Sequence, residues 1–228
     1  MAMKMNRTPT PCNIILEGEK VESVQSFNYL GSIISRDGSS KLEVLNRITK
    51  GSNFFHQVRK LIWNKGVPLR AKQTMYKTYL LPIMTYSLEA CVINKREERQ
   101  IQACEMKFLR SALQKTRRDR VRNEFVRRDL EVTMTMEERM NATRLKWFGH
   151  VKRMHPTRTP CLYLEMEVPG RRPIGRPRKR WTDQVKEDLK RRGVTWDAVE
   201  REQLFKDRNK WRHIVHLVPT RLAGRKTR

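Results

Sequence analysis

The chain has 228 residues, of which 38% are hydrophobic and 32% charged, and its formal net charge is +26. This length suffices for one large or two small domains, and the low hydrophobic fraction predicts a modest core. No apolar run reaches the ~18 residues of a membrane span and residues 1–11 lack the apolar stretch of a secretory signal, so we expect a soluble intracellular protein.

The positive charge predicts a polyanionic partner, because so much like charge destabilises a compact chain unless it is neutralised. Nucleic acid is the first choice and an anionic membrane the second. Residues 1–40 carry four basic and four acidic side chains, residues 41–114 carry 14 and 5, and residues 115–228 carry 32 and 15. Because the first fifth has no net charge, we expect a domain boundary near residue 40.

Short strands are predicted at the start of the chain. The stretches "NIILEG", "KVESV" and "FNYLGSIIS" are rich in β-branched and aromatic residues and are separated by turn-forming residues, as in hairpins. Asp37-Gly38 ends this pattern. A small β-hairpin region over residues 1–40 is therefore expected.

Helical spacing of apolar residues begins after Ser40. The stretch "SKLE" at 40–43 has the sequence of a capping box, and a helix is expected from there to about Gly66. A second helix begins near Pro68 and must bend or stop at Pro82, and a third spans about 96–113. Three helices with short connections predict a small bundle.

Basic helices are expected after this bundle. Residues 115–128 hold seven basic and two acidic side chains with a thin apolar stripe, which predicts a basic amphipathic helix. A further helix is expected to end near residue 154. Five prolines in 155–180 predict an irregular, extended segment, and Gly193 separates two final helices at about 182–192 and 196–217.

The fold class expected from these patterns is mainly α with a small N-terminal β-hairpin. The expected regions are a β-hairpin region, a helical bundle, basic connecting helices, a Pro/Arg-rich extended linker, and C-terminal helices with a tail. Their bounds are 1–40, 41–114, 115–154, 155–181 and 182–228.

Several stretches, taken in order, carry a resemblance to a known family. They are "VESVQSFNYLGSIISRDGS" at 21–39, the helical region at 43–90, "RLKWFGHVKRM" at 144–154, "GRRPIGRPRKRW" at 170–181 and "DRNKWRHIV" at 207–215. Together they resemble the C-terminal part of a non-LTR retrotransposon endonuclease–reverse transcriptase of the RTE-like or jockey-like kind, over about residues 15 to 216.

The resemblance implies that residues 1–40 are the end of a palm and residues 41–114 a thumb-like bundle. It also implies that Tyr29, Leu30 and Gly31 form a primer-grip-like turn, which in those enzymes helps to hold the primer end.

The catalytic motif of that family is missing. Those enzymes, which would use Mg²⁺, place two adjacent aspartates in the palm, and this chain contains no Asp-Asp pair. Two-metal phosphoryl chemistry needs clustered carboxylates. We therefore expect a reverse transcriptase fragment that is not an enzyme, has no cofactor in this chain and has no small-molecule substrate.

The stretch "GRRPIGRPRKRW" allows three interpretations. Its six basic residues and two prolines favour an extended segment that contacts nucleic acid, serves as a nuclear localisation signal or is only a solvated linker. Gly175-Arg176-Pro177 resembles the core of a minor-groove AT-hook, but Ile174 stands where that core has an arginine. In this context we expect a stiff strap across nucleic acid that leads into a helix anchored by Trp181.

Two basic stretches supply the candidate nucleic-acid contacts. The residues are Arg117, Arg118, Arg120, Arg122, Arg127, Arg128, Arg171, Arg172, Arg176, Arg178, Lys179 and Arg180. For the first stretch, a solvated helix face is an equally good interpretation, since most charge runs are exposed surface.

A metal site has little support in the sequence. His150, His155 and Cys161 approach zinc-ligand spacing, but a structural zinc needs four ligands, and the other candidate, Cys104, lies on an apolar helix face and is better explained as a core residue. The tryptophans are expected mainly to pack in the core. We therefore expect no metal.

The expected function is non-catalytic binding of RNA, DNA or both, in the nucleus with transit through the cytoplasm and without a membrane partner. The alternatives are a decayed open reading frame with no activity of its own and a zinc-dependent interaction module. The sequence leaves the oligomeric state open.

Overall fold

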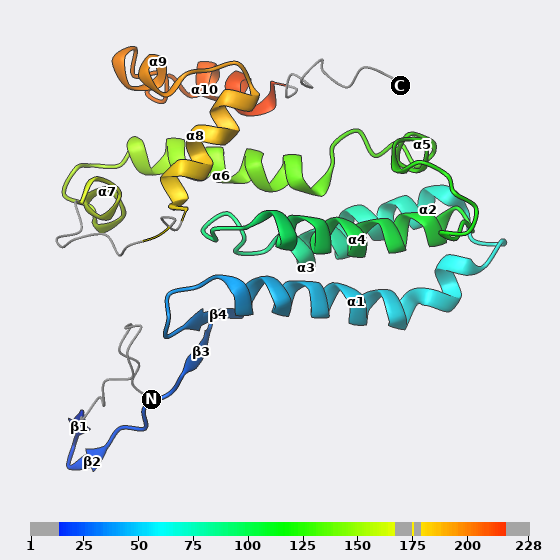
Figure 1. The fold of residues 1–228 in the computed structure, drawn as a ribbon, viewed down its shortest axis with the longest axis horizontal. Coiled ribbons are helices and arrows are strands. Elements are labelled where there is room, and N and C mark those ends of the chain that lie inside the picture. Colours follow the sequence, from blue (N-terminus) through cyan, green and yellow to red (C-terminus); the bar gives the residue numbers. More distant parts are fainter. Residues whose placement is uncertain (1–13, 167–174, 176–178, 218–228) are drawn as a thin grey trace. The chain divides into compact units, whose positions relative to one another are not determined.

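The computed structural model describes residues 14–166, 175 and 179–217 (Figure 1). It is mainly helical with small hairpins near the N-terminus, which confirms the expected fold class. The chain divides into two compact units, Met1–Met136 and Glu137–Arg228. Within the described residues, no helix is long and apolar enough to cross a membrane.

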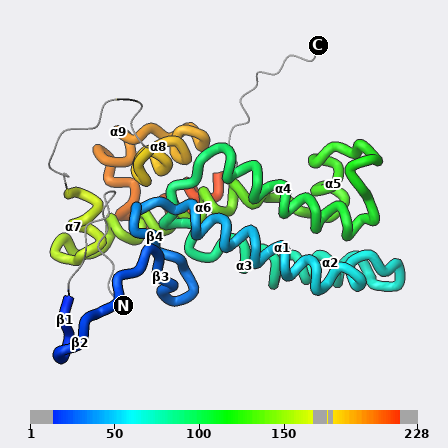
Figure 2. The backbone as a smooth tube through the Cα atoms, turned by 60° about the horizontal axis from the view of Figure 1, so that its bottom comes forward, coloured from blue at the N-terminus to red at the C-terminus, as the bar shows by residue number. Residues whose placement is uncertain are grey.

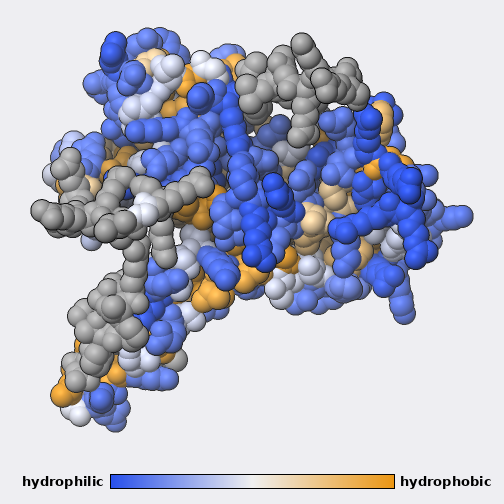
Figure 3. Space-filling model, viewed as in Figure 1, coloured by the Kyte–Doolittle hydropathy of each residue, from blue (hydrophilic) through white to orange (hydrophobic). Residues whose placement is uncertain are grey.

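Two antiparallel hairpins open the first unit. Strand β1 (Ile15–Leu16) pairs with β2 (Glu19–Lys20), and β3 (Ser26–Tyr29) pairs with β4 (Ser32–Ser35). Hydrophobic side chains of β1 remain visible on the surface of this hairpin, at the lower left of Figure 3. The strands therefore form where the sequence predicted them, with part of their apolar surface uncovered.

The helical bundle of the first unit follows directly. It consists of α1 (Lys41–Trp63), α2 (Leu69–Met75), the π-helical η1 (Tyr76–Leu80), α3 (Leu81–Thr85) and α4 (Lys95–Ala112). Helices α1 and α4 run side by side (Figure 2). The buried apolar side chains of this bundle include Val44, Phe55, Ile62, Tyr76, Leu80, Met84, Leu88, Ile101, Phe108 and Leu109.

The second helix was expected to bend or stop at Pro82, and its regular α-helical pattern is interrupted just before that residue. The π-helical η1 changes the hydrogen-bonding pattern just before α3, so Pro82 lies in the first turn of α3. A first-turn position needs no intrahelical N–H donor, and proline is therefore accommodated there.

The expectation of a capping box at residues 40–43 is wrong. The Ser40 side chain makes no cap hydrogen bond and its hydroxyl instead accepts from the backbone N–H of Val92 at 3.1 Å. The Glu43 carboxylate accepts from the N–H of Ile33 at 2.6 Å. Tertiary partners thus replace the local ones. A capping box does form at the start of α4, between Asn94 and Glu97.

The basic helix expected over 115–128 is mostly a loop. Residues 113–122 are irregular, and the helix α5 spans only Asn123–Asp129. The Asp119 carboxylate accepts from the N–H of Thr116 at 2.6 Å, which closes a tight turn, and Arg120 has a positive φ of 50°. These local bonds compete with the helical ones.

The second unit contains α6 (Met136–Lys152), α7 (Thr159–Glu165), α8 (Trp181–Arg191), α9 (Trp196–Arg201) and α10 (Arg208–His216). Helix α6 begins at the boundary between the units.

Two expectations for this unit are wrong. Helix α7 forms inside the segment expected to be irregular, with Pro160 in its first turn, where proline suits a helix. The last expected helix is divided into α9 and α10, because Asp207 caps a new helix by accepting from the N–H groups of Asn209 and Lys210. Gly193, with φ 74°, ends α8 as predicted.

Aromatic rings fill the core of the second unit. The Phe148 ring lies 6.3, 5.5 and 5.8 Å from the rings of Trp181, Trp196 and Trp211. Trp211 is buried and its indole Nε1 donates to the carbonyl of Leu145 at 2.9 Å. Core packing therefore explains these three tryptophans, as the sequence predicted.

A buried ion pair crosses this core. Arg144 Nη1 lies 2.5 Å from Asp188 Oδ2, and both side chains are almost fully buried. Burial raises the pKa of the Asp188 carboxyl, while the Arg144 guanidinium acts in the opposite direction. The pair joins α6 to α8 at the centre of the unit.

We predict that Gly149→Ala destabilises the second unit. A Cβ at Gly149 would stand 2.1 Å from the Trp211 indole nitrogen, so α6 and α10 would have to separate. Overpacking of this kind costs about 2 kcal/mol. Urea unfolding followed by tryptophan fluorescence measures the loss. Gly66→Ala is the control, since its Cβ would meet only Asn64 Oδ1 at 3.3 Å; equal stability of the two variants would contradict the packing argument.

Candidate nucleic-acid interface

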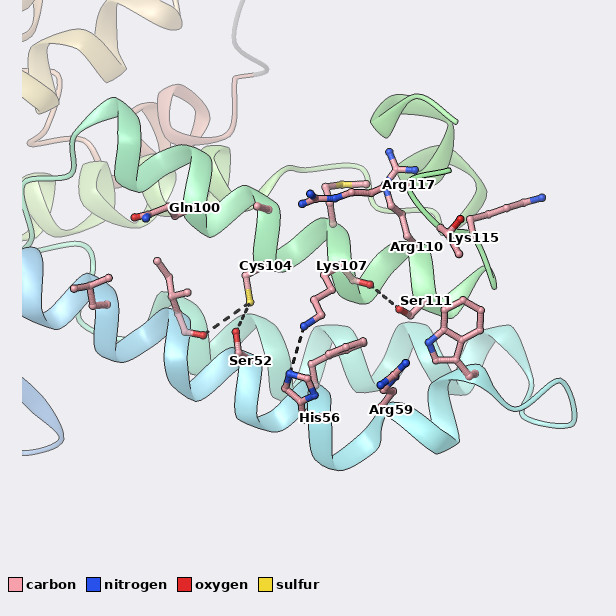
Figure 4. Close-up of a pocket in the computed structure, with 17 residues that line it drawn as sticks. Ser52, His56, Arg59, Gln100, Cys104, Lys107, Arg110, Ser111, Lys115 and Arg117 are labelled. Carbon is pink, nitrogen blue, oxygen red and sulfur yellow. Dashed lines mark hydrogen bonds between the residues drawn. The ribbon is translucent and has the colours of Figure 1, made fainter. Parts of the chain in front are cut away.

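A groove of about 720 Å³ lies between α1 and α4 in the first unit (Figure 4). Its apolar lining comes from side chains such as Ile48, Phe55 and Ala103. Its cationic lining consists of Arg59, Lys107, Arg110, Lys115 and Arg117. Among the described residues that line it, none is acidic. We call this feature the α1–α4 groove.

Helical spacing brings the lining residues together. On α1, Ser52, His56, Arg59 and Trp63 follow one another at intervals of three or four residues, and Cys104 and Lys107 do so on α4. Residues at this spacing share a helix face. Two helices side by side therefore present their polar stripes to the same groove.

Specific contacts hold the centre of the groove. Lys107 Nζ lies 3.4 Å from His56 Nε2 and 4.9 Å from the centre of the Phe55 ring. The Cys104 thiol lies 3.6 Å from Ser52 Oγ, and burial raises its pKa, so the thiol stays protonated. Cys104 is a buried floor residue, as the sequence predicted.

Arg110 connects the groove to the loop that follows α4. Its Nη2 donates to the carbonyl of Val121 and to Asn123 Oδ1, each at 2.7 Å. This guanidinium therefore fixes residues 113–122, which we call the 113–122 loop, while Arg117 on that loop contributes to the groove lining.

The loop exposes most of the first predicted basic stretch. Arg117, Arg118, Arg120 and Arg122 are all exposed. The Asp119 carboxylate among them is engaged by the N–H and the hydroxyl of Thr116, which lower its pKa. The exposed cations can therefore contact phosphates at charge-assisted hydrogen-bond distance.

The last two arginines of that stretch have protein partners. Arg127 Nη2 lies 2.8 Å from Glu105 Oε2, and Glu105 is fully buried. Arg128 is exposed, pairs with Asp129 at 3.3 Å and lies over the Phe125 ring. Arg127 is thus part of the core of the unit, and Arg128 is a surface residue.

The Tyr29-Leu30-Gly31 turn is built on a strained backbone. Leu30 and Gly31 have φ values of 49° and 81°, which match the two central positions of a type I′ hairpin turn. Glycine adopts this region freely, whereas leucine does so at a cost. The Leu30 side chain is 76% exposed at the tip of the hairpin.

A buried ion pair on α1 contacts this turn through Arg47. Glu43 Oε1 lies 2.5 Å from Arg47 Nε, and Arg47 also donates to the carbonyl of Gly31. The Tyr86 hydroxyl donates to the carbonyl of Leu30 at 2.8 Å, and the Arg47 guanidinium lies over the Tyr86 ring. The strained turn is therefore fixed to α1 and to the end of α3.

Most of the arginine-rich stretch lies outside the described residues. This applies to Arg171, Arg172, Arg176 and Arg178. Lys179 pairs with Glu187 at 2.6 Å, and the backbone N–H of Arg180 donates to Asp183 at 2.8 Å. Trp181 packs against Phe148, which agrees with its expected role as the anchor of α8.

The zinc-spaced residues are not brought together. His150 lies against the ring of Trp147, His155 Nδ1 lies 2.8 Å from the Thr157 hydroxyl, and Cys161 is buried. Across the part of the chain that the structure describes, no group of three His, Cys, Asp or Glu side chains could hold a metal ion.

Sequence reasoning missed the groove cations on α1 and α4. Arg59, which is followed by Lys60, and the isolated Lys107 lie in amphipathic helices, and neither belongs to a long charge run. Their helical register with His56 and Cys104 was the available signal, but the pairing of α1 with α4 was needed to use it.

We predict that Glu43→Ala loosens the hairpin turn. The change leaves Arg47 buried without its carboxylate, which costs about 3 kcal/mol. Hydrogen exchange at residues 29–33 should accelerate, and the urea midpoint of the first unit should fall. Glu98→Ala is the control, because its ion-pair partner Lys95 is exposed and such pairs contribute less than about 1 kcal/mol. Equal losses in both variants would contradict the assignment.

The comparisons with known proteins give one match. No family model matches the chain, and no solved structure matches it. The chain is similar to F52C9.6, an uncharacterized transposon-derived protein of Caenorhabditis elegans, with 21% identity over 201 residues. The match covers 86% of this chain and 72% of the relative. This similarity indicates a transposon origin for the chain.

Proposed function

We propose that the chain is a non-catalytic, nucleic-acid-binding fragment of a non-LTR retrotransposon reverse transcriptase. The observation that carries the proposal is the α1–α4 groove, whose lining combines cations from two helices and a loop with no carboxylate. The transposon-derived relative supports a transposon origin, and the motif resemblance is the ground for proposing a reverse transcriptase. The lack of an Asp-Asp pair in the sequence supports the absence of catalysis.

Binding would depend on the sugar–phosphate backbone. Arg59 and Lys107 stand on opposite walls of the groove, and Arg117 extends the cationic surface onto the 113–122 loop. Contacts of this kind position a nucleic acid without selecting its sequence. Helix α1 has 23 residues and is therefore ~35 Å long, so it would follow a duplex for about one helical turn.

The strained hairpin tip would lie at one end of this surface. The exposed Leu30, held by Arg47 and Tyr86, forms a rigid apolar contact for a base or sugar. Backbone strain kept by surrounding contacts is a feature of functional sites. This turn would have the primer-grip role that the resemblance implies. Its partner would be RNA or DNA in the nucleus.

A decayed reading frame is the second candidate. The uncovered side chains of Ile15 and Leu16, which are 70% and 66% exposed, favour it, because strands with bare apolar surface indicate lost packing partners. Such a product would fold poorly and bind nothing specifically.

We predict that removing three groove cations weakens nucleic-acid binding and its salt dependence. The test variant is Arg59→Ala/Lys107→Ala/Arg117→Ala, and fluorescence anisotropy with a labelled RNA–DNA primer–template duplex is titrated across salt. Each lost phosphate contact lowers the steepness of log K against log salt by roughly 0.9. The slope should therefore fall by about 2 to 3.

The control removes the same charge from exposed positions outside the groove, with Lys50→Ala/Lys60→Ala/Arg96→Ala. Its slope should change by less than about 1. Equal effects of the two variants would show that only total charge matters and would contradict the groove assignment. Undetectable wild-type binding at low salt would overturn the proposal and favour the decayed reading frame.

A further inference from the structure

Helix α10 of the second unit has two chemically distinct faces. Trp211, Ile214 and Val215 are buried in the aromatic core. The opposite face exposes Asn209, Arg212, His213 and His216, which follow one another at intervals of three, one and three residues. Arg208 and Lys210 are exposed beside this stripe, and α10 contains no acidic residue.

The buried face is held rigidly. Trp211 donates to the Leu145 carbonyl, and Gly149 leaves room for its indole ring. The buried Arg192 donates to the Val215 carbonyl at 3.3 Å and to the Asp188 carbonyl at 3.0 Å. Because these contacts fix the helix in position and rotation, its exposed stripe is preorganised for recognition.

The positive charge around α10 is not neutralised locally. Within the described residues, Arg208, Lys210 and Arg212 form no ion pair with an acidic side chain. Arg153 Nη1 donates to the Phe205 carbonyl at 2.7 Å. Burial lowers the pKa of Arg153, and the positive charge of Arg208 lowers it further. The Asp207 carboxylate accepts from the backbone N–H groups of Asn209 and Lys210 and offsets one of these three positive charges.

The exposed stripe has the chemistry of base recognition. Arginine pairs in bidentate fashion with guanine, and asparagine does so with adenine, at the major-groove edges of the bases. An α-helix with its side chains is about 10–12 Å across and fits a B-DNA major groove about 12 Å wide. The deep, narrow major groove of an A-form RNA duplex does not admit a helix.

We propose that α10 enters the major groove of double-stranded DNA. Asn209, Arg212 and His213 face the base edges, and Arg208 and Lys210 contact the flanking phosphates. The inference rests on the proposed function, which it deepens by assigning duplex DNA as the ligand of a second surface, separate from the α1–α4 groove.

The test selects preferred sequences for the full chain from a pool of random B-DNA duplexes. The dissociation constants of the enriched duplex, a scrambled duplex, an RNA duplex and a single strand are then measured by anisotropy. The wild type should prefer the enriched over the scrambled duplex by roughly tenfold or more.

Two variants separate base recognition from charge. Arg212→Lys keeps the charge but loses the planar fork, so it should bind the scrambled duplex as the wild type does and lose most of the preference. Asn209→Ala should also lose preference. Lys190→Ala removes one exposed cation from α8 and should keep the preference. Unchanged thermal midpoints confirm that all variants fold, which is expected because these side chains are exposed.

The outcomes distinguish the two proposals. Failure to enrich any sequence, or an unchanged preference in Arg212→Lys and Asn209→Ala, overturns the assignment of α10 while the groove variants still test the proposed function. An RNA duplex bound as tightly as the enriched DNA also overturns it, because the major groove would then not be the site. Absence of binding to every nucleic acid overturns both proposals.

Discussion

The buried carboxylate of Glu105 supports the arrangement on which the candidate interface depends. It accepts a hydrogen bond from the Tyr76 hydroxyl at 2.7 Å and pairs with Arg127 at 2.8 Å, so one side chain of α4 holds both η1 and α5. A buried charge must be paired or it destabilises the fold. Because α5 is fixed in this way and Arg110 fixes the loop before it, Lys115 and Arg117 of the 113–122 loop line the α1–α4 groove.

A small number of acidic residues of this basic chain are buried, and three of them form ion pairs with arginines. Glu43, Glu105 and Asp188 each pair with an arginine in a buried or nearly buried contact. The Glu105 and Asp188 pairs join separate helices, whereas the Glu43–Arg47 pair lies within α1 and reaches the hairpin through further hydrogen bonds to Ile33 and Gly31. Each of these pairs is neutral, so burying it leaves the excess of basic over acidic residues on the surface, and the formal net charge is +26. This excess, together with a groove lining that holds cations and no acidic side chain among the described residues, is the electrostatic basis of the polyanion binding that we propose.

The two units present different chemistry to nucleic acid. The α1–α4 groove combines cations with an apolar floor and suits backbone contact, whereas α10 places an asparagine, an arginine and histidines on one face, as base recognition requires. The strained turn at Leu30 is held by Arg47 and Tyr86 and is a second candidate contact surface of the first unit.

Local sequence patterns determined the existence and type of most elements. The hairpins, helices α1 and α4 and the stop at Gly193 follow from side-chain sterics and from periods of two or 3.6 residues, which act over a few neighbouring positions. Tertiary structure decided the rest. Ser40 bonds to Val92 and Glu43 to Ile33, both on other segments, so the expected capping box is replaced by long-range contacts. The expected basic helix is replaced by the 113–122 loop, in which local bonds between Thr116 and Asp119 compete with helical ones. The groove likewise required α1 and α4 to pack side by side, because no single helix shows which of its cations will face another helix.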